Sequence, residues 1–515
     1  MSQENKGFVY LVGAGPGRAD LITVRGAEVI RAADCIIYDK LANPALLRYA
    51  RPDAEIIHVP KRIGSGSCKQ DQINKLLVEK ASPGRIVVRL KGGDPCIFGR
   101  GAEEAGVLAE AGIDFEIVPG VTAAVAAAEY TGVMLTDRDY SSQVAFITGR
   151  EADGKIESNI DWSLLAKFPG TIVFYMGMGN LDFITSRLAD NGMNEEMPAA
   201  VIANATLPIQ TITKAPLNLI ADKCKQEKIE PPAIIVIGPA AAGDANLSWF
   251  MKKPLFGKTI VVTRDRRGNA DFAAKIISRA GNPIEFPTIK IEPLVEKNDF
   301  LQVLAKFSEY DWIIFTSPNG VCIFFDFLRT LAKDARVFAS VKIAAVGTET
   351  AAKLADFGIR PDFVPTTFTT KELAGQLTGF TNLRDKKILL LRSHLASGEL
   401  VELLRQAGAD VDNVPLYTAV SEKCKSKPLI EKINGGAVDW LTFTSPSCVS
   451  AFFEQVKPDV VKSAKVKVAS IGPVTSAQLK ELGVGIDAQA AQHTIDGLLE
   501  AIEECEKQNS QSDEY

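Results

Sequence analysis

Residues 85–101 (RIVVRLKGGDPCIFGRG) combine an apolar run, two glycine pairs and a carboxylate, and this combination suits the binding of a small ligand. The β-branched run at 86–88 predicts a strand that is buried on both faces of a parallel sheet. Gly92 and Gly93 remove two side chains where that strand ends, so a ligand can lie against bare backbone. Asp94 adds an acceptor for a hydroxyl or a cationic group. The alternative is an ordinary turn that leads into the next helix.

A second glycine-rich segment, 13–17 (GAGPG), follows an apolar strand pattern at 8–12, as a dinucleotide fingerprint does. In a Rossmann turn the helix begins inside the glycine motif, so that the pyrophosphate meets the helix N-terminus. Here Pro16 interrupts the motif, and residues 18–20 intervene before helix periodicity begins at Thr23. An NAD-dependent oxidoreductase is therefore a rival interpretation that this spacing weakens.

Length and composition indicate a globular protein of several domains. At about 150 residues per domain, 515 residues predict roughly three or four units. The 58 Lys and Arg residues nearly balance the 63 Asp and Glu residues and form no long basic run, which argues against a nucleic-acid partner. Eight cysteines without a CxxC pair and three histidines predict neither a disulfide framework nor a metal site.

The N-terminal residues, MSQENKG, are polar, and the chain has no apolar run long enough to cross a bilayer. We therefore expect a cytoplasmic protein with no membrane partner.

Strand and helix patterns alternate along the chain, which predicts an α/β fold. A break at 249–257 precedes a fresh strand pattern at 258–263, so we place a domain boundary there.

The second half repeats itself. The segment 310–325 (YDWIIFTSPNGVCIFF) recurs as 438–453 (VDWLTFTSPSCVSAFF), which predicts two similar α/β lobes. Each copy carries Thr-Ser-Pro between a strand and a helix, so Ser317 and Ser445 are expected as helix N-caps. The functional alternative is that both helix N-termini offer N–H groups to a ligand rich in carboxylates.

Ordered motifs give residues 7–249 a strong resemblance to uroporphyrinogen-III C-methyltransferases; they include VYLVGAGPG, YDKLANP, VPKRIG, RLKGGDPCIFGRG, VPGVTAA, FYMG and PAIIVIG. The resemblance implies two α/β lobes with S-adenosylmethionine between them and allows a homodimer formed through this half. It also implies the cofactor contacts, which are Pro16, Gly92, Gly93, Asp94, Ile97, Thr122, Ala123, Met176 and Ala205.

By the same resemblance Asp39 is the general base and Lys61 the proton donor. Methylation of a ring carbon leaves a cationic, iminium-like product that must lose a proton, and a carboxylate can take it. The alternative for Asp39 is a helix N-cap, and the alternative for Lys61 is a solvated surface pair with Arg62. The sequence also departs from the family pattern, at Arg18, Gly66, Cys96, Asp137 and Ala205.

The second half resembles uroporphyrinogen-III synthases through shorter motifs: DWIIFTSPNGV, AVGTETAAKL, VPLYTAV and IGPVTSAQL. That family uses no cofactor. Tyr417 matches a tyrosine proposed to assist departure of the substrate hydroxyl, and its alternative is an interfacial aromatic residue with a solvated hydroxyl. The substrate-binding candidates are Arg264, Ser317, Arg392, Ser445 and Thr475. A non-catalytic two-lobed binding module is the rival interpretation of this half.

Together the two resemblances predict a bifunctional enzyme that makes uroporphyrinogen III and methylates it at C2 and C7 to precorrin-2, on the route to siroheme or cobalamin. S-adenosylmethionine is the expected cofactor, and tetrapyrroles are the expected partners. The chain is expected to stop at precorrin-2, because no separate nicotinamide site is left. The expected domains are 1–249, a linker at 250–256, a synthase with one lobe at 257–288 plus 419–505 and the other at 289–418, and a polar tail at 506–515.

Overall fold

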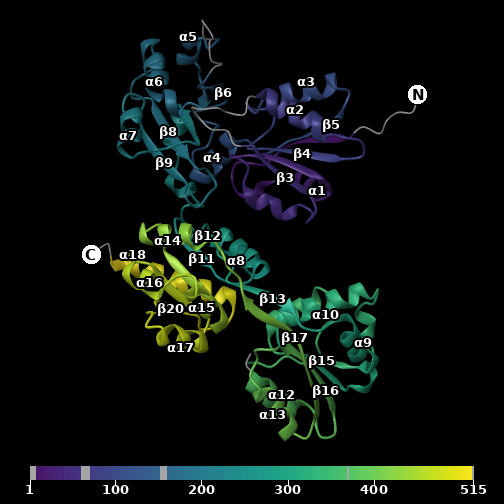
Figure 1. The fold of residues 1–515 in the computed structure, drawn as a ribbon. Helices are drawn as coiled ribbons and strands as arrows, with labels where there is room; N and C mark the ends of the chain where they lie inside the picture. Colours follow the sequence, from purple (N-terminus) through teal and green to yellow (C-terminus); the bar gives the residue numbers. More distant parts are fainter. Residues whose placement is uncertain (1–6, 60–69, 151–158, 368–369, 513–515) are drawn as a thin grey trace, which may run out of the picture. The chain divides into compact units, whose positions relative to one another are not determined.

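The computed structural model describes residues 7–59, 70–150, 159–367 and 370–512, and it divides into two compact units, Met1–Gly257 and Lys258–Tyr515 (Figure 1). Each unit contains two five-stranded sheets with helices packed on them. The predicted α/β class with two lobes in each half is confirmed.

The first sheet of the first unit has the strand order β3-β2-β4-β1-β5, and all its neighbouring strands run parallel. The carboxyl ends of these strands therefore share one edge, where ligands bind in open α/β sheets. Its strands are β1 (Phe8–Gly13), β2 (Cys35–Asp39), β3 (Glu55–Val59), β4 (Ile86–Lys91) and β5 (Asp114–Val118), and its helices are α1 (Val24–Ala32), α2 (Gln70–Lys80) and α3 (Gly101–Glu110).

The second sheet, of order β6-β7-β10-β8-β9, is mixed. In this sheet β6 and β7 pair in parallel, and the other neighbouring strands are antiparallel. Strand β9, which pairs with β8, was not predicted. That strand reads TITKAP and lies at the sheet edge, so it has no continuous apolar run to mark it. The strands are β6 (Val144–Thr148), β7 (Thr171–Tyr175), β8 (Pro198–Ala203), β9 (Thr211–Pro216) and β10 (Ala233–Ile237), and the helices are α4 (Ala123–Thr131), α5 (Trp162–Ala166), α6 (Leu181–Asp190) and α7 (Ile220–Gln226).

Residues 250–256, which were expected as a linker, pack onto the first unit. Phe250 is 1% exposed and Leu255 is 0% exposed. The Phe250 ring lies 4.8 Å from the ring of Tyr130, and the Arg18 guanidinium lies 5.8 Å from the Phe250 ring. This segment therefore contributes apolar packing to the first unit.

The second unit joins its two sheets by an antiparallel strand pair, β13 and β17. The predicted lobe boundaries at 288/289 and 418/419 fall at the start of β13 and inside β17. One sheet contains β11 (Thr259–Val262), β12 (Asn282–Glu285), β18 (Trp440–Phe443), β19 (Lys467–Ser470) and β20 (Ala488–Gln489); the other contains β13 (Ile289–Pro293), β14 (Trp312–Phe315), β15 (Lys342–Ala345), β16 (Lys387–Ser393) and β17 (Asp410–Ser421). The helices are α8 (Arg266–Ser278), α9 (Lys297–Ala305), α10 (Pro318–Thr330), α11 (Thr348–Ala355), α12 (Thr370–Phe380), α13 (Glu399–Gln406), α14 (Ser426–Asn434), α15 (Pro446–Phe453), α16 (Pro458–Ser463), α17 (Pro473–Glu481) and α18 (Ile495–Ser512).

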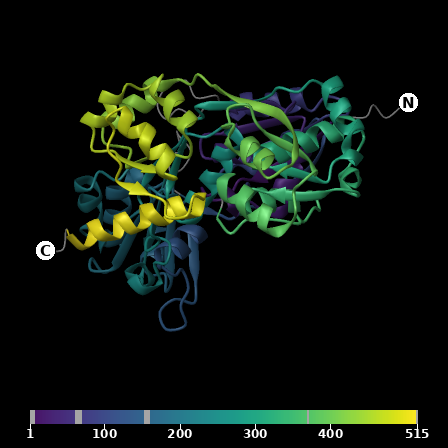
Figure 2. The ribbon, with the colours of Figure 1, turned by 90° about the horizontal axis from the view of Figure 1, so that it is seen from below.

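The last helix, α18, is one continuous element (yellow in Figure 2) that is anchored by a buried carboxylate. Glu506 is 7% exposed and pairs with Lys258 at 2.5 Å and Lys467 at 2.8 Å, while Trp440 Nε1 donates to it at 3.0 Å. The expected polar tail at 506–515 thus begins inside a helix that holds the ends of β11, β18 and β19.

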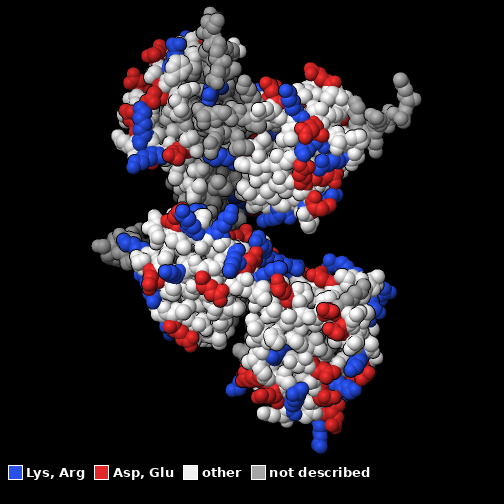
Figure 3. Space-filling model, in the orientation of Figure 1, with Lys and Arg blue, Asp and Glu red and all other residues white. Residues whose placement is uncertain are grey.

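Acidic and basic side chains are interspersed on the face of each unit seen in Figure 3. Among the described residues, no helix is long and apolar enough to cross a membrane. Within the same residues, no group of three or more His, Cys, Asp and Glu side chains could hold a metal ion.

A fragment that ends at Gly257 is expected to be more stable than one that ends at Lys252, because the shorter fragment lacks Phe256, whose ring lies 5.6 Å from the ring of Phe250. An aromatic pair of this kind contributes about 0.5–1.5 kcal/mol. Urea unfolding of both fragments measures the difference, and Lys252→Ala in the longer fragment is the control, since this exposed side chain should change stability by less than about 0.5 kcal/mol. Equal stability of the two fragments would contradict the packing described above.

Candidate active sites

Three loops meet backbone to backbone at the carboxyl edge of the first sheet. Gly15 N donates to Gly93 O at 3.2 Å, and Gly93 N donates to Gly15 O at 2.8 Å. A Cβ atom on Gly120 would lie 2.3 Å from Gly93 O, and one on Gly13 would lie 2.5 Å from the Gly120 Cα. Since real Cβ atoms do not approach so closely, the loops after β1, β4 and β5 can join only through glycine.

This arrangement is not a Rossmann turn. Helix α1 begins at Val24, and its N-cap is Thr23, whose hydroxyl accepts from Gly26 N at 3.1 Å. The helix N-terminus therefore lies outside the glycine motif at 13–17, so a dinucleotide pyrophosphate could not meet both at once. This spacing argues against the oxidoreductase interpretation.

The carboxylate of Asp94 holds two of these loops together. Its Oδ1 accepts from Cys96 N at 2.8 Å and from Ile97 N at 3.2 Å, and its Oδ2 accepts from Gly120 N at 3.1 Å. A carboxylate has about four acceptor positions, so these bonds leave roughly one for a ligand. The predicted ligand acceptor thus also shapes the loop.

Exposed apolar side chains border the bare backbone. Ile97 is 38% exposed and Met176 is 53% exposed. Phe98, Arg100 and Met176 have φ angles of 53°, 60° and 55°, which non-glycine residues adopt rarely and mostly at functional positions. The Phe98 ring lies 5.0 Å from the ring of Tyr175 at the end of β7, so both lobes contribute to this border.

Tyr175 fixes the start of α4, which carries the predicted Thr122 and Ala123. Its hydroxyl lies 2.7 Å from Thr122 Oγ1 and accepts from Ala124 N at 3.2 Å. Burial raises the pKa of Tyr175, which keeps the phenol neutral. Tyr175 was not among the predicted site residues, because its partners lie about 50 positions away in the chain.

The predicted Pro16 and Ala205 lie on loops that meet next to the glycine contacts. Arg18 N donates to Thr206 Oγ1 at 3.0 Å, and a Cβ atom on Gly17 would lie 2.7 Å from that same oxygen. Pro16 and Ala205 directly precede Gly17 and Thr206 in the chain, so the two lobes are joined at this point.

Asp39 lies at the end of β2 and is 7% exposed. Its Oδ1 accepts from Leu41 N at 3.1 Å, and its Oδ2 pairs with Arg89 at 3.2 Å. The alternative role of helix N-cap belongs instead to Asn43, whose side chain accepts from Ala45 N at 2.9 Å.

Lys61 and Gly66 lie outside the described residues. Of the other departures from the family pattern, Arg18 binds Asp20, and Cys96 is an exposed thiol. Asp137 holds a turn, because its carboxylate accepts from Asp139 N at 2.8 Å.

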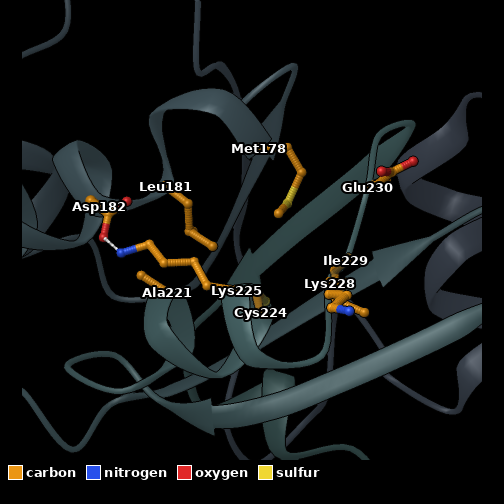
Figure 4. Close-up of a pocket in the computed structure, with 9 residues that line it drawn as sticks. All are labelled: Met178, Leu181, Asp182, Ala221, Cys224, Lys225, Lys228, Ile229 and Glu230. Carbon is orange, nitrogen blue, oxygen red and sulfur yellow. Dashed lines mark hydrogen bonds and ion pairs between the residues drawn. The ribbon is translucent and has the colours of Figure 1, made fainter.

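A pocket of about 250 Å³ opens in the second lobe, and the predicted site residues do not line it (Figure 4). Two of the residues that line it, Lys225 and Asp182, form an ion pair at 2.5 Å. Its lining is Met178, Leu181, Asp182, Ala221, Cys224, Lys225, Lys228, Ile229 and Glu230.

In the second unit Tyr417 is buried, and its hydroxyl is hydrogen-bonded. It is 6% exposed, and its hydroxyl lies 2.7 Å from Ser317 Oγ. Ser317 Oγ also accepts from Gly320 N at 3.1 Å, which confirms Ser317 as the N-cap of α10. Burial raises the pKa of Tyr417, so the phenol keeps its proton at neutral pH.

The other candidates fall into one group per lobe. Arg264, Ser445 and Thr475 follow the neighbouring parallel strands β11, β18 and β19, so they share one sheet edge. Ser445 caps α15 by accepting from Cys448 N at 3.3 Å, and Thr475 is buried.

Arg392 belongs to the other lobe, together with Ser317 and Tyr417. It is buried, and its Nη2 donates to Ala396 O at 2.6 Å. Burial lowers the pKa of Arg392, which marks a cation that an incoming anion would stabilise.

Comparisons with known proteins divide the chain in the same way. The family model for Tetrapyrrole (Corrin/Porphyrin) Methylases matches residues 9–221, and the model for Uroporphyrinogen-III synthase HemD matches residues 270–500. The porphyrin biosynthesis protein HemD of Ruminiclostridium josui is 38% identical over 96% of this chain and 97% of its own length. A uroporphyrinogen-III C-methyltransferase of Priestia megaterium is 47% identical over 45% of this chain and 97% of its own length.

Among solved structures, a uroporphyrin-III C-methyltransferase from Thermus thermophilus complexed with S-adenosyl homocysteine is 34% identical. It covers 46% of this chain and 99% of its own, with a TM-score of 0.40, so the assignment rests on the sequence relatives. The resemblances seen in the motifs are thereby confirmed. The chain belongs to the tetrapyrrole methylases through its first unit and to the HemD family of uroporphyrinogen-III synthases through its second, and it is a bifunctional enzyme of tetrapyrrole biosynthesis.

Proposed function

We propose that the second unit closes hydroxymethylbilane to uroporphyrinogen III and that the first unit methylates this product at C2 and C7 to give precorrin-2. The observation that carries the proposal is that one sheet edge presents both the glycine loops and a buried carboxylate. A Cβ atom on Gly92 would lie 2.6 Å from Leu41 Cβ, so the loop that follows Asp39 touches the loop that carries Asp94. Cofactor and base can therefore act on one substrate.

The residues at this edge fit S-adenosylmethionine, the methyl donor of the first unit. Leu41 covers the side-chain position of Gly92, whereas a Cβ atom on Gly93 would meet nothing closer than 3.7 Å, so Gly93 leaves room for a ligand. The Asp94 carboxylate suits a hydroxyl or a cation, and Ile97 and Met176 offer apolar contact. When bound, this cofactor supplies a methyl group that its sulfonium already activates. The protein then contributes mainly alignment.

Asp39 completes the methylation by accepting a proton. Methyl transfer leaves the methylated ring carbon fully substituted and makes the macrocycle a cationic, iminium-like species. A bridging methylene carbon beside the cationic ring then loses a proton, and the electron pair of its C–H bond neutralises that charge. The carboxylate of Asp39 takes this proton. Oδ1 is held by Leu41 N and Oδ2 by Arg89, which fixes the direction in which the carboxylate points.

In the second unit the neutral phenol of Tyr417 donates a hydrogen bond to the departing hydroxyl of hydroxymethylbilane. Loss of water generates the electrophile, and ring D is inverted through a spiro intermediate as the ring closes. Arg264 and Arg392, with the N-termini of α10 and α15, supply positive potential for the substrate carboxylates.

A homodimer formed through the first unit and a cytoplasmic location are further proposals. Light scattering of the purified chain checks the first, since a dimer gives twice the 55.5 kDa chain mass.

The whole chain, incubated anaerobically with hydroxymethylbilane, S-adenosylmethionine and NAD, is expected to give a dimethylated cyclic product without NADH. Mass analysis and absorbance at the NADH maximum read out the two results. Chromatography identifies the isomer that forms. Absence of the type III isomer would refute the synthase proposal, and type III product without added methyl groups would refute the methylase proposal. Enzyme-dependent NADH with sirohydrochlorin would show a dehydrogenase site beyond those proposed.

Substitutions at two aspartates should separate cofactor binding from chemistry. Asp94→Asn is expected to weaken S-adenosylhomocysteine binding by about tenfold, because a hydrogen bond to a charged group is worth roughly 1.5–3 kcal/mol. Asp39→Asn should bind normally and lower the single-turnover methylation rate by about a hundredfold. Calorimetry and rapid quench measure these effects, and an unchanged rate in Asp39→Asn would remove it as the base.

Tyr417→Phe is expected to lower the synthase rate by about ten- to a hundredfold, because it removes the hydrogen-bond donor while keeping the ring. Tyr310→Phe is the matched control, since Tyr310 is also buried in this lobe and donates to Asp412 at 2.5 Å. Both rates and the isomer formed are measured by chromatography. Equal rates for the two variants would assign Tyr417 to packing.

A further inference from the structure

A buried chain of four charged side chains runs from Asp39 to the first turn of α3. Arg89 Nη2 lies 3.2 Å from Asp39 Oδ2, and Arg89 Nε lies 3.3 Å from Glu104 Oε1. Lys91 Nζ lies 2.7 Å from Glu104 Oε2, and Gln70 Nε2 donates to Glu104 Oε1 at 2.9 Å. Arg89, Lys91 and Glu104 are at most 3% exposed. Two cations face two carboxylates, so the cluster is neutral.

The cluster connects the elements that carry both predicted parts of the methylase site. Asp39 ends β2, and Lys91 ends β4 immediately before Gly92. Glu104 lies in the first turn of α3, directly after the loop that contains Asp94. Arg89 and Lys91 are two residues apart on one strand, so they project from the same face of the sheet.

Stability alone does not explain this cluster. Taking four charges out of water costs free energy, and buried ion pairs are often no more stabilising than apolar side chains of similar volume. The guanidinium of Arg89 contacts Asp39 and Glu104 through different nitrogens, so its planar fork fixes the angle between the two carboxylates. A lysine ammonium has no such fixed geometry.

The two cations of the cluster, Arg89 and Lys91, also differ in their environment. Burial lowers the pKa of Lys91, which makes it the weaker of the two cations, although Glu104 opposes this effect. The guanidinium of Arg89 lies beside Asp39, while Lys91 and the neutral Gln70 hold Glu104.

We propose that Arg89 and Glu104 are positioning residues for methyl transfer: Arg89 orients the Asp39 carboxylate, and Glu104 orients Arg89. This inference rests on the proposed role of Asp39 as the base. Both residues would then affect the rate of methyl transfer through Asp39. Neither of them needs to touch the cofactor or the substrate.

A double-mutant cycle on the full chain tests the proposal, with uroporphyrinogen III and S-adenosylmethionine in single-turnover rapid quench. Arg89→Lys is expected to slow methyl transfer by about tenfold and to leave S-adenosylhomocysteine affinity within about twofold. In an Asp39→Asn background the same change should slow the reaction by less than about twofold, since its effect passes through Asp39. Circular dichroism verifies that each variant is folded.

Arg25→Lys is the matched control. Arg25 holds Glu116 through Nε at 2.9 Å and Nη2 at 2.8 Å, so it uses the same fork on the exposed surface. Its substitution should leave the methylation rate unchanged. If Arg89→Lys does not fold, Glu104→Gln takes its place in the cycle with the same expected pattern.

Equal losses in the two backgrounds, or an unchanged rate in Arg89→Lys, would overturn the positioning role. An unchanged rate in Asp39→Asn with Arg89 intact would instead remove the base and this inference together. The single and double variants therefore distinguish a failure of the inference from a failure of the proposed mechanism.

Discussion

The contact among the backbones of Gly13, Gly93 and Gly120 is the constraint on which the methylase unit depends. Parallel strands bring the carboxyl ends of β1, β4 and β5 to one edge, and the absence of side chains lets their loops touch. Asp94 then bonds across the contact to Gly120 N. The result is a surface of backbone next to the loop that carries Asp39, and we propose that the cofactor binds there.

Burial acts differently on the two candidate sites. In the first unit, Asp39 belongs to a neutral cluster of two buried cations and two carboxylates, so its carboxylate has a charged partner away from water. In the second unit, burial raises the pKa of Tyr417 and keeps a proton available for donation. We therefore propose opposite roles, in which Asp39 accepts a proton and Tyr417 donates a hydrogen bond.

Local features were predictable from the sequence, and distant pairings were not. The strand at 86–88, the glycine break after it and the caps at Ser317 and Ser445 follow from neighbouring residues. The Arg89–Asp39 pair joins residues 50 positions apart, and its arginine stands in a strand that reads as mostly apolar. No periodicity marks such a pair.

Strand β9 and the burial of Phe250 were also not predictable, because both depend on partners outside their own segments. The polar edge strand β9 gains its structure by pairing with β8, so its own sequence gives a weak signal. Phe250 reads as part of a connector, yet it is covered by Tyr130 and Arg18 from distant parts of the first unit. Family resemblance located the candidate residues, but only the structure shows which atoms of Asp39, Asp94 and Tyr417 are already engaged.

Calorimetric titration of the full chain with S-adenosylhomocysteine tests the glycine contact most directly. Gly120→Ala places a Cβ atom 2.3 Å from Gly93 O, whereas Gly106→Ala, within α3, has nothing within 4 Å of the added atom. Gly106→Ala is expected to bind like the unsubstituted chain. Gly120→Ala, still folded by circular dichroism, is expected to lose about tenfold or more in affinity, equivalent to about 1.4 kcal/mol. Undiminished binding by Gly120→Ala would contradict the claim that this backbone contact builds the cofactor site.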